Sequence, residues 1–115
     1  MVKIYHNPRC STSRRGCDTL TEIKEPYQII NYMAEPLSIE ELKDLISKLG
    51  IKPIELVRTK EEIWKTEFAD KKLTDNQIIE AMHNHPKLIQ RPIVVKGDKA
   101  IIGRPTELIK EFLEN

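Results

Sequence analysis

The chain has 115 residues, a net charge of +1, and hydrophobic side chains at 39% of its positions. A chain of this length can bury about two-thirds of its unfolded surface, so we expect one domain, residues 1–115, with a core that needs no disulfide or metal. The near-neutral charge gives no electrostatic basis for binding nucleic acid or a membrane surface, and no apolar run is long enough to cross a bilayer.

The first part of the chain predicts a strand, a helix and a second strand. Apolar residues favour strands over residues 2–5 and 27–32. Between them, apolar and small residues recur at helical spacing from Thr12 to about residue 24, and Gly16 only slightly weakens this helix. The order strand–helix–strand favours parallel pairing of the strands with a right-handed crossover.

Residues 38–85 are predicted to form an all-helical insertion. Two capping boxes, Ser38–Glu41 and Thr74–Gln77, each begin a helix that carries an apolar stripe. Two shorter helices are expected between them, over residues 53–58 and 60–69. His83 and His85 have no acidic or cysteine partners, so a charge role at the helix C-terminus is favoured over a metal site.

The pattern returns to strands after the insertion. Residues 93–96 and 99–102 are predicted strands, and Gly97-Asp98 between them is typical of a type II′ hairpin turn. An amphipathic helix then begins near Pro105 and turns four apolar residues inward: Leu108, Ile109, Phe112 and Leu113. The whole order, βαβ, helical insertion, ββα, predicts an α/β fold of the thioredoxin-like type.

The most informative stretch is Val2–Arg15. The first strand ends at Asn7-Pro8, and Cys10 stands directly before the helix. The unpaired N–H groups and positive dipole of a helix N-terminus favour a thiolate, which is the reactive form of cysteine. The same N–H groups can bind an oxyanion. We therefore favour a reactive thiol at Cys10 over an inert core cysteine.

Two neighbours of Cys10 are candidates for stabilising its thiolate. Ser13 could donate a hydrogen bond to the sulfur, or could simply cap the helix. His6 would help to hold a thiolate if it were an imidazolium, or could pack as an ordinary loop residue. Arg14 is interpreted as a surface charge, and Asn7 and Pro8 as residues that set the loop.

Three arginines are candidate anion ligands. Arg91 and Arg104 each precede a proline, and Arg58 ends a short helix of the insertion. Guanidinium groups suit a tetrahedral oxyanion because they are always charged and can bind two oxygens at once. Each arginine taken alone is more simply a surface charge, and the sequence does not show that they converge.

Three motifs together carry a family resemblance. The pattern His-Asn-Pro-x-Cys-x-Thr-Ser-Arg at His6–Arg14, the segment Gln90–Val95, and Gly103-Arg104-Pro105 before a short helix resemble the glutaredoxin-coupled arsenate reductases. The resemblance covers nearly the whole chain. It implies a thioredoxin-like fold with a helical insertion and reduction of arsenate to arsenite by Cys10. It also implies glutathione as co-substrate, glutaredoxin as electron source, and no bound cofactor or metal.

The same resemblance assigns roles to other residues. It implies that Arg58, Arg91 and Arg104 bind arsenate and that Pro92 is a cis-proline beside Cys10. With two cysteines lacking zinc-type spacing, and no signal peptide before the first strand, we expect a cytoplasmic protein. The expected oligomeric state is a monomer.

Cys17 departs from the family pattern. It lies two helical turns from Cys10, about 10 Å, which is too far for a disulfide unless the helix unwinds. We therefore favour a core residue over a resolving thiol. Two alternative functions remain open: a redox regulator that binds RNA polymerase, or a thiol reductase acting on glutathione adducts. Redox switches of the first kind commonly use Cys-x-x-Cys, and here the second position is Ser13.

Overall fold

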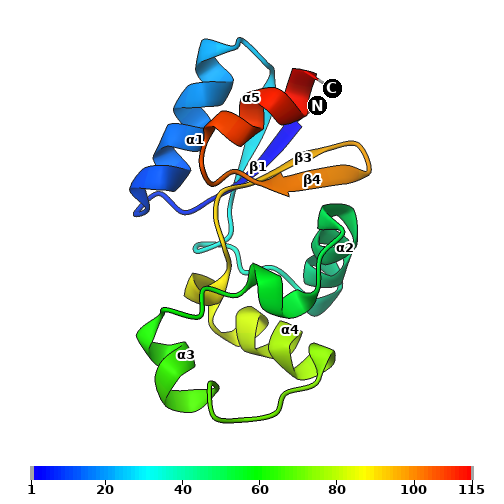
Figure 1. Cartoon of the computed structure of the whole chain (residues 1–115). Coiled ribbons are helices and arrows are strands. Elements are labelled where there is room, and N and C mark those ends of the chain that lie inside the picture. The colour runs from blue at the N-terminus through cyan, green and yellow to red at the C-terminus, as the bar shows by residue number, and fades with distance from the viewer. Residues whose placement is uncertain (1, 115) are drawn as a thin grey trace. The chain divides into compact units, whose positions relative to one another are not determined.

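The computed structural model describes residues 2–114 and divides the chain into two compact units (Figure 1). The first unit joins the chain up to Glu35 with the chain from Arg91 onward, and the second is Pro36–Gln90. The second unit contains the predicted insertion, residues 38–85, and extends it slightly at both ends.

The first unit is built on a four-stranded sheet with the order β2-β1-β3-β4. Strand β1 (Val2–His6) pairs in parallel with β2 (Tyr27–Asn31) and antiparallel with β3 (Ile93–Lys96). Strand β4 (Lys99–Ile102) completes the sheet antiparallel to β3. This is the predicted thioredoxin-like arrangement, with each strand within one residue of its expected bounds.

Helices α1 (Ser11–Glu22) and α5 (Glu107–Glu114) pack against each other and lie on one face of this sheet (Figure 1). Their apolar side chains join those of β1 and β3 in one core cluster: Val2, Ile4, Leu20, Val94 and Ile109. Phe112 and Leu113, two of the residues predicted to face inward, are partly buried against this cluster. The core therefore fixes α1 above β1, whose C-terminal end leads into the Cys10 loop.

The hairpin between β3 and β4 has the predicted backbone. Gly97 has a φ of +64°, whereas Asp98 has a negative φ, as a type II′ turn requires. Glycine is needed at the first position because a side chain there would be strained.

The second unit is mostly helical. Its helices are α2 (Ile39–Leu49), α3 (Glu62–Glu67) and α4 (Asp75–Asn84), with two 3₁₀ turns, η1 (Pro53–Leu56) and η2 (Pro86–Leu88). Both predicted capping boxes form, with Ser38 capping α2 and Thr74 capping α4. Val57, which falls within the helix expected over residues 53–58, instead forms an isolated antiparallel β-bridge with Ile89, which lies beyond the predicted insertion.

The two histidines of the second unit have packing roles that the sequence did not indicate. His83 Nδ1 lies 2.7 Å from the carbonyl oxygen of Leu37. The His85 ring packs edge-on against Phe68, with ring centroids 5.8 Å apart. Both histidines thus hold segments of the unit together, and they also stand at the predicted place, where His83 lies in the last turn of α4 and His85 is its C-cap residue.

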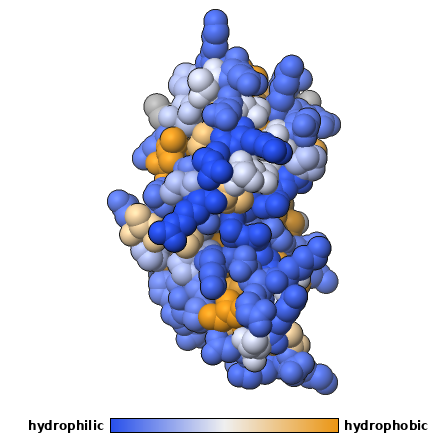
Figure 2. Space-filling model, turned by 90° about the vertical axis from the view of Figure 1, so that its left-hand side faces the viewer, coloured by the Kyte–Doolittle hydropathy of each residue, from blue (hydrophilic) through white to orange (hydrophobic). Residues whose placement is uncertain are grey.

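One face of the protein can be described by the hydropathy of its side chains. Figure 2 shows a face that is mostly hydrophilic, with hydrophobic residues in small separate groups. Across residues 2–114, none of the helices combines the length and the apolar character needed to cross a bilayer. The same residues contain no group of three or more histidine, cysteine, aspartate or glutamate side chains placed to bind a metal ion.

Gly16 permits a close approach between α1 and the segment before β3. A Cβ atom at this position would lie 2.8 Å from Pro92 Cγ and 3.3 Å from Ile4 Cδ1. The first distance is shorter than real carbon contacts, so any larger residue would push α1 away from Pro92. The sequence marked Gly16 only as a weak point of the helix, and the structure gives the reason for its presence.

We predict that Gly16→Ala lowers the free energy of unfolding by about 1–3 kcal/mol, because the added methyl group overpacks the contact with Pro92. Alanine would otherwise stabilise a helix by about 1 kcal/mol relative to glycine. Urea unfolding measures the change, and the exposed α1 variant Asp18→Ala should shift the free energy by no more than about 0.5 kcal/mol. A more stable Gly16→Ala protein would contradict this packing.

Candidate active site

Cys10 is the N-cap residue of α1, at the end of a loop that Asn7 organises. The backbone N–H of Cys10 donates to the Asn7 carbonyl at 3.0 Å, and the Arg9 N–H donates to Asn7 Oδ1 at the same distance. Asn7 is buried, whereas Cys10 is partly exposed. The loop thus presents the sulfur at the surface while its backbone is held by hydrogen bonds, as predicted for Asn7.

The surroundings of Cys10 favour its thiolate. Burial raises the pKa of Cys10, but the Ser13 backbone, the Arg91 guanidinium and the Thr12 backbone outweigh it and bring the pKa below its ordinary value. The sulfur makes no side-chain capping hydrogen bond with the helix. The backbone amides of Thr12 and Ser13 therefore act on Sγ as nearby dipoles, as expected at a helix N-terminus.

The Ser13 hydroxyl is fully buried and contacts two groups. Its Oγ accepts the Asn7 backbone N–H at 3.0 Å and lies 2.7 Å from His6 Nδ1. Because Cys10 Sγ is not among its partners in the described chain, we assign the hydroxyl proton to His6 Nδ1, which makes Nε2 the protonated ring nitrogen. Ser13 therefore acts on the thiolate through its backbone, whereas donation by its hydroxyl was one of the two roles that the sequence left open.

His6 was also left with two roles by the sequence, a charged imidazolium or a packed loop residue. Burial lowers the pKa of His6, a hydrogen bond with the Ser13 backbone raises it, and the charge of Arg14 lowers it, with a lowered pKa as the net result. The ring is therefore mostly neutral at pH 7 and does not supply the positive charge that an imidazolium would bring. The His6 ring has a structural role instead, because it binds the Ser13 hydroxyl at the end of β1.

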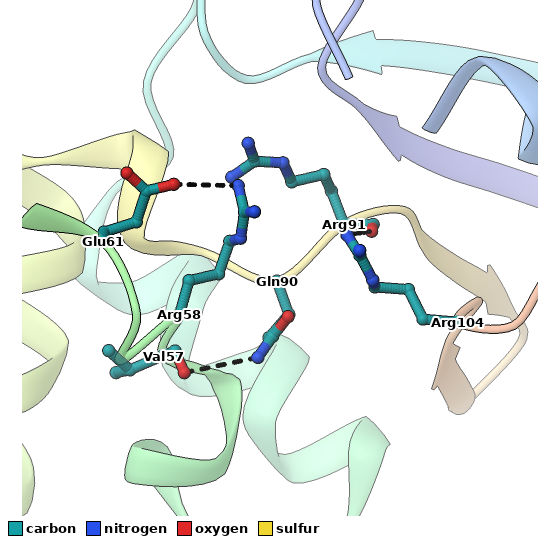
Figure 3. Close-up of polar contacts among 6 residues, drawn as sticks. All are labelled: Val57, Arg58, Glu61, Gln90, Arg91 and Arg104. Atoms are coloured by element: carbon teal, nitrogen blue, oxygen red, sulfur yellow. Dashed lines mark hydrogen bonds and ion pairs between the residues drawn. The ribbon is translucent and has the colours of Figure 1, made fainter. Parts of the chain in front are cut away.

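Arg91 is the guanidinium that acts on Cys10, both by hydrogen bonding and by its charge. The side chain is buried, with 8% of its surface exposed. Arg104 donates from Nη1 to the backbone carbonyl of Arg91 at 3.3 Å (Figure 3). The peptide bond between Arg91 and Pro92 is cis, which confirms the expectation from the resemblance, and the bond between Arg104 and Pro105 is also cis. Arg91, Pro92 and Arg104 are thus brought together beside the first turn of α1.

Arg58 lies in the other unit of the chain. Its guanidinium forms an ion pair with Glu61, with 3.1 Å between Nη1 and Oε1 (Figure 3). Its backbone N–H donates to the Leu88 carbonyl at 2.7 Å, next to the Val57–Ile89 bridge. The assignment of Arg58 to the anion site stays a prediction.

Two further residues of α1 have clear surroundings. The Arg14 guanidinium is exposed and donates to the Pro8 carbonyl at 2.8 Å, so it supports the loop. Cys17 is partly buried against the core cluster. Burial raises the pKa of Cys17, and the charge of Asp18 raises it further. The two cysteines therefore differ chemically, because the pKa of Cys10 is lowered and the pKa of Cys17 is raised.

Fold and site together describe a thioredoxin-like protein whose first helix begins at an activated cysteine. The profile of the ArsC family matches residues 5–112. The chain belongs to the ArsC family.

Comparisons with individual proteins agree with this. The chain is 43% identical to "Arsenate reductase" of Haemophilus influenzae, over 97% of this chain and 98% of that protein. It is also 43% identical to the uncharacterised Escherichia coli protein YfgD, over 97% of this chain and 96% of the relative. A solved structure titled arsenate reductase from Vibrio cholerae superposes with a TM-score of 0.90 at 43% identity, covering 96% of this chain and 95% of that one.

Ser13→Ala separates the two ways in which Ser13 could act on the thiolate. We predict a loss of about 1–3 kcal/mol in the free energy of unfolding, because the buried Asn7 N–H loses its acceptor. The pKa of Cys10 should stay lowered, because the Ser13 backbone amide remains. Urea unfolding and a pH titration of thiolate absorbance measure the two effects, with the exposed Ser11→Ala as control. A pKa that returns to the ordinary cysteine value would indicate that the hydroxyl itself binds the sulfur.

Arg91→Gln should raise the pKa of Cys10, because both the charge and the hydrogen-bonding guanidinium are lost. At pH 7 the thiolate fraction falls, so alkylation by iodoacetamide slows. Arg91→Lys keeps the charge and should keep part of the effect. Arg14→Gln is the matched control, since its guanidinium contacts Pro8; an equal rise of the Cys10 pKa in this variant would mean that general surface charge, rather than Arg91, controls the thiol.

Proposed function

We propose that the protein reduces arsenate to arsenite, with Cys10 as the nucleophile. The observation that carries the proposal is a surface-accessible cysteine with a lowered pKa, next to a helix N-terminus and the Arg91 guanidinium. The same arrangement suits a thiolate and a tetrahedral oxyanion, because both are anions held by N–H donors. Relatives over 30% identical that bear the name arsenate reductase support the choice of oxyanion.

The first step joins sulfur to arsenic. Arsenate docks against the helix amides, Arg91 and Arg104, with Arg58 as a further proposed ligand. The Cys10 thiolate attacks arsenic, an S–As bond forms, and hydroxide leaves and is protonated to water. The positive groups offset the repulsion between an anionic nucleophile and an anionic substrate, and they hold the two in line.

The second step moves two electrons to arsenic. A thiolate from outside the chain attacks Cys10 Sγ, a disulfide forms, and the S–As bonding pair stays on arsenic. Protonation releases arsenite, which is neutral at pH 7 and is held less strongly by arginines than arsenate. We propose glutathione as the attacking thiol and glutaredoxin as the thiol that then frees Cys10 by exchange. No resident metal or organic cofactor takes part. We place this reaction in the cytoplasm and in a monomer.

A second reaction uses the same thiolate. A thiol reductase acting on glutathione adducts would need only the lowered pKa of Cys10 and exchange with a disulfide. It would not depend on arsenate, so the two functions give different results in one assay.

The test is steady-state arsenate reduction with glutathione and glutaredoxin supplied. Cys10→Ser should lose at least about a thousandfold in rate, because the nucleophile is removed. Cys17→Ser is the matched control and should keep most activity, because Cys17 is a protonated, partly buried thiol. Equal loss in both variants would replace the external thiol with an intramolecular route through Cys17. Wild-type turnover that is independent of arsenate would favour the thiol reductase.

A further inference from the structure

A pocket of about 320 Å³ lies beside the first turn of α1 in the first unit. Its lining residues come from α1 and from the segment that enters α5: Thr12, Arg15, Arg104, Pro105, Thr106 and Glu107. Two of these residues, Thr12 and Arg104, are connected to Cys10 by the contacts described above. The Thr12 backbone acts on Cys10, and Arg104 donates to the carbonyl of Arg91, whose guanidinium also acts on Cys10.

The pocket is positively charged. Arg15 and Arg104 each contribute one positive charge and Glu107 one negative charge, which leaves an excess of one positive charge on the lining. In the described part of the chain, no ion pair joins Glu107 to either arginine, and no hydrogen bond or ion pair engages the Arg15 guanidinium. Two guanidinium groups with hydroxyl neighbours are a suitable environment for a carboxylate.

The number of electrons that the proposed reaction consumes means that Cys10 needs a thiol from outside the chain. Reduction of arsenate to arsenite takes two electrons, and one cysteine that ends as a disulfide supplies them only with a second sulfur as partner. Cys17 is a poor partner, because its pKa is raised and it packs into the core cluster. The second sulfur must therefore reach Cys10 from solvent, past the residues that surround it.

We propose that this pocket binds the carboxylate of a small thiol and so positions its sulfur for attack on Cys10, with Arg15 as a specificity-determining residue. The inference rests on the proposed function in one respect, because that function identifies arsenate as the substrate. The step itself is thiol–disulfide exchange: an S–S bond forms at Cys10 Sγ while the bond from Sγ to its leaving group breaks. Arg15 was not selected from the sequence, because an arginine in a helix is usually a surface charge.

The test uses symmetric disulfides that differ in charge and needs no arsenate. The Cys10 thiolate attacks a disulfide, its S–S bond breaks, a mixed disulfide forms on Cys10, and one thiolate leaves. The second-order rate constants are measured for the anionic 3,3′-dithiodipropionate, the neutral hydroxyethyl disulfide and the cationic cystamine. Peptide mass spectrometry locates the adduct on Cys10. The ratio of the anionic to the neutral rate constant measures how strongly the pocket favours a carboxylate. The neutral probe corrects for changes in the reactivity of the thiol itself.

Three variants make the comparison specific. Arg15→Gln should lower the anionic-to-neutral ratio about two- to fivefold, as expected for an exposed ion pair, and high salt should reduce the difference. Glu107→Gln should raise the ratio, because it removes the competing carboxylate. Arg9→Gln is the matched control: Arg9 is also exposed and adjacent to Cys10, but it lines a different pocket, with Asn7, Pro8 and Asn31.

The outcomes separate this inference from the proposed function. An equal fall of the ratio in Arg15→Gln and Arg9→Gln, or no fall in either, would overturn the pocket, since only a general field would remain. A protein that fails to reduce arsenate but shows the Arg15-specific change would overturn the arsenate assignment and keep the pocket. Reversed selectivity, with the cationic probe fastest in the wild type, would also overturn the proposal.

Discussion

The hydrogen bonds of one buried hydroxyl hold the site together. Ser13 Oγ belongs to the first turn of α1, accepts the Asn7 N–H from the loop, and binds His6 at the end of β1. Three segments therefore share one polar atom of the fully buried Ser13, and Asn7 is buried beside it. A buried amide or hydroxyl without a partner is costly, so this arrangement admits few alternatives. The Ser13 backbone amide is thereby fixed where it can act on Cys10.

Two opposing effects set the pKa of Cys10, and both arise from the packing of the loop against α1. Packing the loop against α1 partly buries the sulfur, which by itself favours the neutral thiol. The same packing brings in the backbone donors of the helix and the Arg91 guanidinium, which favour the thiolate. Gly16 belongs to the same packing of α1 against the segment that carries Arg91. Its missing side chain lets α1 approach Pro92, the residue that follows Arg91.

The sequence predicted what depends on local pattern. Strand β1, the two capping boxes and the turn at Gly97 follow from periodicity, capping chemistry and glycine backbone freedom, and all are present. The sequence did not predict the hydrogen-bond partner of a side chain that has several possible neighbours. His6 and Ser13 stand at suitable spacing to touch Cys10, but they bind each other, with 2.7 Å between Nδ1 and Oγ, and burial disfavours a charged imidazole. Such choices depend on tertiary distances that spacing does not encode.

Arg91 can stabilise both the Cys10 thiolate and the bound anion of the proposed reaction. This is possible because the negative charge moves only from sulfur to the neighbouring arsenic oxygens. When Cys10 is a thiolate, the negative charge lies on its Sγ atom, and the guanidinium favours this form by lowering the pKa of the thiol. Once sulfur bonds to arsenic, the sulfur carries no charge, and the negative charge lies on the arsenic oxygens. A planar guanidinium with several donors can follow this shift without leaving its place. The contact of Arg104 with the Arg91 carbonyl holds the backbone beneath that side chain, so a second arginine contributes to the site without contacting the sulfur.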